Sequence, residues 1–355
     1  MQNIKIRKVR EVAHETFKDI HRYQKGEKKI VKTGEEMIDS HLGGLLPGDV
    51  VLLSGRSGTG KSEKLYKILD NMLTEEVNVF SENYVSLEYS MEMKMLNKLL
   101  RAIHNRTGKK KQEILTEKFT EEERNIVAKY SKGLEDNRRF VVQEPVTPEQ
   151  YYRMTRDFCK EHQDKDAIII SSDHILLHSG SDKQKVLEKV TEYTNLLKLE
   201  FENVYFILVS QLNRNSYPEP KERNNSMRPD NTWLYGSSFM EHVASYIIII
   251  ENAYKLGVND YLKINKKRYN YLSDYFTEED AKGRVSFDTL GNLFFFITKV
   301  RDSDNMWKDI FIEEMNLTEE QLEKMKLDVS QKEGKVEAGD FLIDLPKMEE
   351  GEILF

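Results

Sequence analysis

The sequence predicts an α/β fold in which helices cover both faces of a mostly parallel β-sheet. Two observations lead to this prediction. Short apolar runs, such as VVLLSG at 50–55 and YIIIIE at 246–251, alternate with longer segments whose apolar residues recur at helical spacing. The short runs are also apolar almost throughout, instead of at every second residue, which is typical of strands buried on both faces.

The expected elements follow one another along the chain. Residues 9–25 place apolar side chains at three- and four-residue intervals, which predicts an amphipathic helix that ends at Gly26. A buried strand at 50–55 then leads through a glycine loop into a helix that reaches about residue 75. Strands are also expected at about 82–88, 138–143, 166–172, 204–210 and 245–251, helices at about 92–106, 120–132, 147–162 and 183–200, and added antiparallel strands at 260–267 and 293–300.

Composition excludes several classes of protein. Of the 355 residues, 39% are hydrophobic and 32% are charged, so the chain has enough apolar material for a large core. The single cysteine, Cys159, excludes an intrachain disulfide and a multi-thiolate zinc site. No run approaches the ~18 apolar residues of a membrane span, and the N-terminus has no signal-peptide pattern. We therefore expect an unprocessed cytoplasmic protein without a membrane partner.

The charge is concentrated at one end. The formal net charge is −7, but residues 313–355 carry thirteen acidic and five basic side chains, a net −8 that leaves +1 for the rest of the chain. A whole-chain charge of this kind does not exclude nucleic acid as a partner of local loops. The acidic tail is expected either to be a solvated terminus or to dock on a partner protein.

A phosphate-binding loop is the strongest motif. Residues 55–62 match G-x-x-x-x-G-K-[ST] in full, between an expected strand and an expected helix. The glycines let backbone N–H groups converge on phosphate oxygens, and the helix N-terminus adds positive charge. The loop predicts that ATP binds together with Mg²⁺, which Ser62 would ligate. The nucleotide-binding residues are Gly55, Arg56, Ser57, Gly58, Thr59, Gly60, Lys61 and Ser62.

Two carboxylates are candidates for the accompanying chemistry. Asp173 ends the strand IIISSD and is expected to be the metal-side acid, with a turn or capping role as the alternative. Glu88, in VSLEYS, is the candidate general base, with a solvated strand-end carboxylate as the alternative. We expect Glu88 to lie one strand over from the phosphate loop, an arrangement typical of RecA-type motors.

Several motifs in order resemble the C-terminal ATPase domain of the DnaB-like replicative DNA helicases. They are TGEEMIDSHLGGLLPGDVVLLSGRSGTGKS, VSLEYSMEMKMLNKLLRAI, SSDHILL, ILVSQLNR, WLYGSSFMEHVASYIIII and ITKVRDSDNMWKDIFI, and the resemblance covers about residues 9–312. It implies a linker helix and connector at 1–45, a RecA-like ATPase domain at 46–312 and the acidic tail at 313–355. The globular N-terminal domain of the family is expected to be missing.

The resemblance also assigns roles to individual residues. Glu88 corresponds to the catalytic glutamate, Asp173 to the metal-side acid and Gln211 to the sensor that links the nucleotide to the DNA loops. Lys299 and Arg301, in TKVR, correspond to the pair that reaches the γ-phosphate of the neighbouring subunit. An arginine supplied in trans makes hydrolysis depend on assembly, so a homo-oligomer, most simply a hexamer, is expected.

Loops that face a central channel contact single-stranded DNA in this family. The corresponding residues here are Lys183, Lys185, Arg223, Arg228, Tyr235, Gly236 and Ser238. The alternative for the lysines and arginines among them is that they are ordinary solvated loop residues that do not contact DNA. LYGSSFMEH also departs from the family pattern L-R-E-S-G-x-I-E-Q, because Tyr235 replaces an arginine; a tyrosine can stack on a base instead.

The sequence thus predicts an ATP-dependent replicative DNA helicase that works as a ring on single-stranded DNA. A primase or a loader protein is expected as a further partner, and the compact size is consistent with a phage-encoded protein in the host cytoplasm. The alternative is a RecA/KaiC-like ATPase switch, or a helicase-accessory assembly protein, that separates no strands. The helix at 9–25 would pack on a neighbouring subunit in the first case, although packing on its own subunit remains an alternative.

Overall fold

The computed structural model describes most of the chain. The described residues are 6, 8–28, 30–134, 137–175, 178–180, 182–213, 229–256, 258, 260–263, 276–279, 285–300, 309–315, 317, 319 and 321–326. They fall into two compact units. The first contains helices α1–α9 and strands β1–β5 with most of β6, the second contains β7–β9, and β10 has residues in both.

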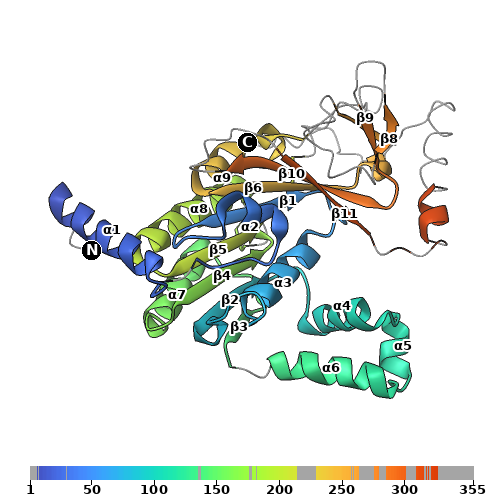
Figure 1. Cartoon of the computed structure of the whole chain (residues 1–355), viewed down its shortest axis with the longest axis horizontal. Coiled ribbons are helices and arrows are strands. Elements are labelled where there is room, and N and C mark those ends of the chain that lie inside the picture. The colour runs from blue at the N-terminus through green and yellow to red at the C-terminus, as the bar shows by residue number, and fades with distance from the viewer. Residues whose placement is uncertain are drawn as a thin grey trace, which may run out of the picture. The chain divides into compact units, whose positions relative to one another are not determined.

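Eight strands form the main sheet, in the order β11-β10-β6-β1-β5-β4-β2-β3 (Figure 1). The pairs β1 with β5 and β6, β2 with β3 and β4, and β4 with β5 are all parallel, which confirms the predicted mostly parallel sheet. The strands are β1 Val50–Gly55, β2 Tyr84–Ser90, β3 Arg139–Val142, β4 Ala167–Asp173, β5 Val204–Val209, β6 Tyr246–Glu251, β10 Asn292–Val300 and β11 Asp309–Glu314.

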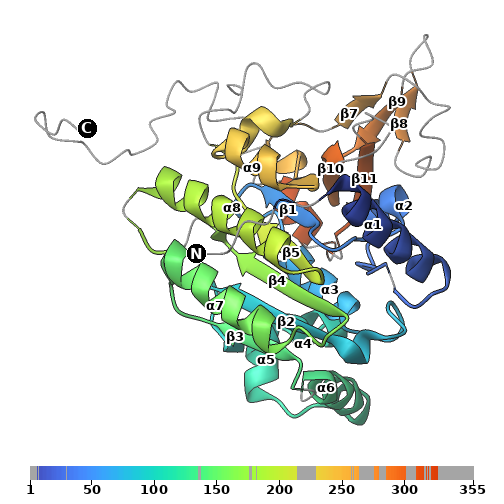
Figure 2. The same cartoon turned by 90° about the vertical axis from the view of Figure 1, so that its left-hand side faces the viewer.

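The centre of the sheet is the core of the first unit. Every residue of β1, β4, β5 and β6 is buried, in keeping with their continuous apolar sequences. Figures 1 and 2 show α3 on one face of this sheet and α7 and α8 on the other. The helices are α1 Val9–Gln24, α2 Glu36–Leu42, α3 Lys61–Met72, α4 Met95–Thr107, α5 Lys111–Thr116, α6 Glu121–Leu134, α7 Pro148–Glu161, α8 Lys183–Glu200 and α9 Ser237–Val243.

The second unit holds a small sheet of its own. Its three strands are antiparallel, in the order β7-β9-β8, with bounds β7 Asp260–Lys263, β8 Phe276–Glu279 and β9 Val285–Asp288. The strand expected at 260–267 therefore corresponds to β7, whereas β8 and β9 were not predicted. None of the helices in the described ranges is long and apolar enough to cross a membrane.

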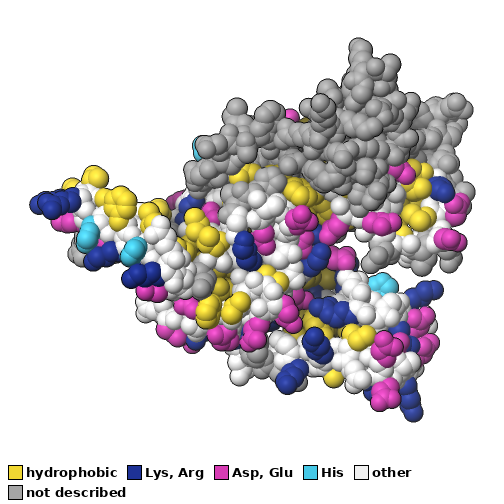
Figure 3. All heavy atoms as spheres, viewed as in Figure 1, with side chains coloured by type: hydrophobic (Ala, Val, Ile, Leu, Met, Phe, Trp, Pro, Cys, Tyr) yellow, Lys and Arg dark blue, Asp and Glu magenta, His cyan; other side chains and the backbone are white. Residues whose placement is uncertain are grey.

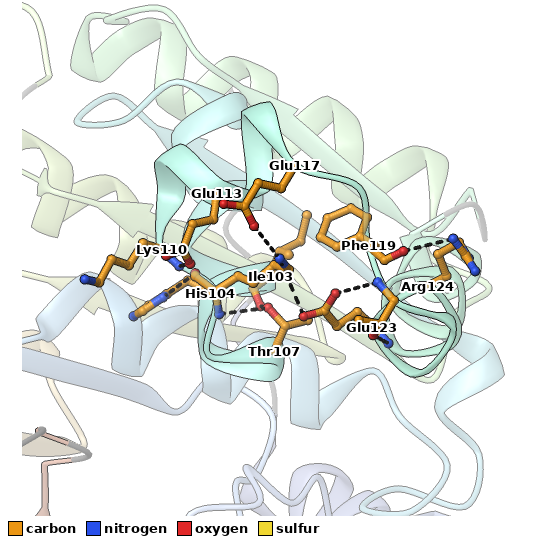
Figure 4. Close-up of polar contacts among 11 residues, drawn as sticks. Ile103, His104, Thr107, Lys110, Glu113, Glu117, Phe119, Glu123 and Arg124 are labelled. Atoms are coloured by element: carbon orange, nitrogen blue, oxygen red, sulfur yellow. Dashed lines mark hydrogen bonds and ion pairs between the residues drawn. The ribbon is translucent and has the colours of Figure 1, made fainter.

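Helices α4, α5 and α6 are joined by hydrogen bonds and ion pairs around the turns between them, a region called here the α4–α6 corner (Figure 4). The ammonium group of Lys109, between α4 and α5, donates to Glu117 Oε2 at 3.0 Å and lies 3.8 Å from Glu123 Oε1 on α6. The other oxygen of Glu123 accepts from the backbone N–H of Thr120 at 2.7 Å and caps α6. Lys109 thus contacts both the residue that follows α5 and a residue in the first turn of α6.

Helix α1 confirms the predicted amphipathic helix but buries none of its residues. Val9 is 83% exposed and Phe17 70% exposed, and Val12 and Ile20 on the same face are exposed as well. Figure 3 shows hydrophobic side chains along the surface of α1. Packing of this apolar face on the described part of its own chain, the alternative considered from the sequence, is therefore not found.

Candidate functional site: a phosphate loop beside two carboxylates

The loop 55–62 joins β1 to α3 and has the backbone conformation that its glycines permit. A Cβ atom at Gly55 would lie 2.4 Å from the carbonyl oxygen of Ile250 on β6, so only glycine fits at this position. Gly58 and Gly60 adopt positive φ angles of 78° and 83°. Helix α3 begins at Lys61, so its N-terminal N–H groups belong to the loop. The Lys61 ammonium donates to the carbonyl of Arg56 at 2.6 Å.

Asp173, at the end of β4, accepts hydrogen bonds from two residues of α3. Ser62 Oγ donates to Asp173 Oδ1 at 2.9 Å, and the Tyr66 hydroxyl donates to Asp173 Oδ2 at 2.6 Å. Burial and the negative charges of Asp173 and Glu88 raise the pKa of Tyr66, so its hydroxyl stays protonated and remains a donor. The structure thus brings the predicted metal-side acid together with Ser62, while the contact of Tyr66 was not predicted.

This donor set suits the predicted ion. A hydroxyl and a carboxylate are hard oxygen ligands, which Mg²⁺ prefers, and Asp173 is fully buried beside the phosphate loop. Ser62 and Asp173 are therefore the residues that would hold the ion. The described residues contain no cluster of three or more His, Cys, Asp or Glu side chains that could form a separate metal site.

Glu88 lies on β2, next to β4, and pairs with Lys98 of α4. The Lys98 ammonium donates to Glu88 Oε1, and the two side chains are 7% and 15% exposed. Burial raises the pKa of Glu88, and the Lys98 charge opposes that rise. The expected position one strand over from the phosphate loop is wrong, because β5 and β4 both lie between β1 and β2. Glu88 is instead one strand from Asp173.

Gln211 follows β5 and is joined to Tyr235 through the backbone. The Tyr235 N–H donates to the Gln211 carbonyl at 3.1 Å, and the Asn213 N–H donates to the Trp233 carbonyl at 2.6 Å. Between these bonds, Leu212 and Leu234 form an antiparallel bridge. The predicted sensor segment and a predicted DNA segment are therefore one hydrogen-bonded unit.

The remaining predicted DNA residues are only partly described. Lys183 opens α8 and donates to the His178 carbonyl at 3.2 Å, whereas Lys185 is 80% exposed and lies 3.8 Å from Asp182. Gly236 is the N-cap residue of α9 and has φ 64°, and Ser238 is exposed. Lys299 on β10 donates to the Glu241 carbonyl of α9. The predicted residues Arg223, Arg228 and Arg301 lie outside the described residues.

A cavity of about 500 Å³ opens beside Glu88. It lies among α3, α4, α6, β2 and β3, and both Glu88 and Lys98 line it. Arg139 of β3 and Arg106 of α4 also line the cavity, and both form ion pairs with Asp70 of α3. The Glu88–Lys98 pair therefore has one side toward the sheet and one side toward an open space under the α4–α6 corner.

Comparison with protein families decides the assignment. Residues 30–275 match the model of the DnaB-like helicase C terminal domain. The chain belongs to this DnaB-like family. The family match and the parallel sheet confirm the resemblance and the fold class expected from the motifs. No curated protein sequence matches the chain.

Two solved structures share the fold of this DnaB-like chain. One, described as an "ATPase Domain", superposes with a TM-score of 0.62 at 16% identity, over 88% of this chain and 100% of that one. The other, "The Structure Of A DnaB-Like Replicative Helicase And Its Interactions With Primase", gives a TM-score of 0.59 at 16% identity, over 88% of this chain and 65% of that one. At this identity the two matches establish the fold alone.

Proposed function

We propose that this DnaB-like chain is an ATP-driven motor that moves along single-stranded DNA and unwinds duplex as a hexameric ring. One observation carries the proposal: the phosphate loop, the Ser62–Asp173 pair and Glu88 all lie toward the carboxyl ends of strands in a parallel sheet. Ligands of open α/β sheets bind at the carboxyl ends of the strands, where these residues are found. This arrangement supports the proposed roles of the loop as a phosphate cradle, of Asp173 as the metal-side acid and of the part-buried Glu88 as the base.

The proposed reaction is hydrolysis of ATP: water attacks the γ-phosphorus, the bond to the β–γ bridging oxygen breaks, and ADP and inorganic phosphate leave. The N–H groups of the loop and Lys61 would bind the phosphates and neutralise their charge. Ser62 and Asp173 would hold Mg²⁺, which adds charge neutralisation at the phosphates when bound. Glu88 would accept the proton of the attacking water, and its Oε2 is the oxygen that Lys98 leaves available.

The proposed ring places each nucleotide between two copies of the chain. Arg301 and Lys299 of one copy would neutralise the transition-state charge on ATP held by the next copy. The exposed apolar face of α1 is the part of the first unit that a neighbouring copy would cover, since the described residues leave Val9 and Phe17 exposed. Hydrolysis at such an interface would depend on assembly.

Proposed DNA contacts follow from the same arrangement. Gln211 would register the nucleotide and pass the change to Tyr235 through the backbone bridge. Tyr235 would stack on a base, and Gly236, Ser238, Lys183 and Lys185 would follow the phosphates, so the contacts would carry no sequence information. One of the matched structures is described with its primase interactions, and we propose a primase or a loader as a further partner of this chain.

A second candidate is an ATP switch that assembles on DNA without separating strands. The observation that favours it is Tyr235, since a tyrosine in place of the family's arginine removes a phosphate contact from the channel loop. The switch predicts ATP-dependent assembly with little unwinding, whereas the motor predicts unwinding with a fixed polarity.

The test is ATP turnover of the purified protein with and without single-stranded DNA, with particle mass recorded by mass photometry. The variants are Lys61→Ala and Arg301→Ala, with Lys160→Ala on the exposed side of α7 as the matched control. We expect DNA to stimulate turnover in the parent and the control, and both site variants to lose turnover while Arg301→Ala still forms rings. Turnover indifferent to DNA, or an active monomer unaffected by Arg301→Ala, would refute the motor.

A further inference from the structure

A buried lysine that the family motifs do not assign contacts the proposed base. Lys98 lies on α4, ten residues after Glu88, and its ammonium donates to Glu88 Oε1. Within the described part of the chain, this is the one hydrogen bond that the Glu88 carboxylate accepts. We propose that Lys98 is a positioning residue for Glu88: it fixes one carboxylate oxygen and leaves Oε2 to take the proton of the attacking water.

The surroundings of Lys98 confine its ammonium group to a position beside Glu88. The side chain is 7% exposed, so its charge is removed from water and needs a close counter-charge. Its ammonium also lies 4.3 Å from the centre of the Tyr66 ring, a cation–π contact that confines it from a second side. A solvated surface lysine would have neither constraint, so the geometry points to a fixed orientation of Glu88.

The same contacts connect Glu88 to the metal-side acid. Tyr66, whose ring faces Lys98, donates its hydroxyl to Asp173 Oδ2 at 2.6 Å, and Asp173 Oδ1 accepts from Ser62 at 2.9 Å. A continuous series of contacts thus runs from Ser62 on the phosphate loop to Glu88 on β2. Lys98 and Tyr66 set the separation between the residue that would hold Mg²⁺ and the residue that would activate water.

Other charged groups around Glu88 do not replace Lys98. Arg139 of β3 contributes a smaller favourable field, but its guanidinium is bound to Asp70 of α3. Asp173 of β4 contributes an opposing negative charge. Tyr66 and Tyr130, from α3 and α6, are phenols whose pKa values are raised, so they carry no charge at neutral pH. Removal of the Lys98 charge therefore leaves the part-buried Glu88 carboxylate with desolvation and the charge of Asp173 both favouring its protonated form.

The proposal rests on the proposed ATPase, and its test separates the two. Lys98→Met removes the charge but keeps an unbranched side chain of similar length, Lys98→Arg restores a cation, and Lys94→Met is the matched control at an exposed position one turn earlier. For each protein, the kcat for ATP is measured across pH together with the affinity for a fluorescent ATP analogue.

We expect Lys98→Met to lower kcat by about 100-fold and to move the acid limb of the kcat profile to higher pH. Nucleotide affinity should stay within about twofold of the parent, since the phosphate loop is intact. Lys98→Arg should recover most of kcat and the parental limb, and Lys94→Met should match the parent.

Three outcomes would contradict these expectations. A parent without ATP turnover would overturn both the proposed function and this inference. An active parent with a Lys98→Met variant of parental kcat and pH profile would overturn the inference alone. Loss of nucleotide affinity in parallel with kcat would also overturn it, because Lys98 would then support the fold of the site and not the orientation of Glu88.

Discussion

Gly236→Ala tests whether a residue assigned to DNA contact also has a packing role. Gly236 has φ 64°, where an alanine costs about 1–2 kcal/mol. A Cβ atom there would lie 2.3 Å from Leu187 Cδ2, and Leu187 is fully buried on α8. Displacing a buried methyl group costs about 1–3 kcal/mol. The sum predicts a loss of about 2–5 kcal/mol in the free energy of unfolding.

Urea denaturation followed by circular dichroism measures this loss, and Gly108→Ala is the matched control. Gly108 has φ 74° but has no atom within 4 Å of an added Cβ, so it retains the backbone cost and lacks the clash. The difference between the two variants isolates the contact with Leu187, which should be about 1–3 kcal/mol. Equal losses in the two variants would refute the close packing of α9 on α8.

Three further perturbations probe other parts of the molecule. Phe17→Asp should abolish ring formation in mass photometry while the free energy of unfolding stays within about 0.5 kcal/mol, because Phe17 is 70% exposed; Leu199→Asp, at an 82% exposed position, should leave assembly intact. Tyr66→Phe keeps the ring beside Lys98 but removes the hydroxyl that donates to Asp173. The Mg²⁺ concentration for half-maximal ATP turnover should therefore rise about tenfold. An unchanged concentration would contradict a role of that hydrogen bond in holding the ion. Burial lowers the pKa of His178 to about 4, whereas a histidine in the unfolded chain titrates near ~6.5. Below about pH 6.5 the unfolded state therefore binds a proton that the folded state does not. The free energy of unfolding is expected to fall as the pH drops from about 6.5 toward 4, by at most about 3 kcal/mol. The urea midpoint should therefore be lower at pH 5 than at pH 7, and this difference between the two midpoints should be smaller in His178→Phe.

The buried strands were predictable because their sequences are continuously apolar. The order of the strands was not, since parallel strands are joined by crossovers and chain order does not fix spatial order. That is why Glu88 was expected one strand from the phosphate loop, although β5 and β4 lie between. Strands β8 and β9 carry only four residues each, FTEE and VSFD, and have no apolar run to mark them.

The two contacts of the site that were not predicted differ in whether the sequence could have indicated them. Tyr66 follows Ser62 by four residues, the spacing that places two side chains on one helix face, so its approach to Asp173 could have been inferred. Lys98 has no such signal, because its contact with Glu88 depends on where α4 returns to the sheet after β2. A charged residue in a helix is usually solvated, and only the packing shows that this one is buried.

The bridge between the segments around Gln211 and Tyr235 has a consequence for engineering. Its bonds join main-chain atoms, so they do not depend on which side chain stands at position 235. An exchange such as Tyr235→Arg is therefore expected to change the side chain of this loop while the backbone hydrogen bond to Gln211, which follows β5, is kept. The side chain at position 235 and the backbone connection to Gln211 can therefore be varied independently of each other.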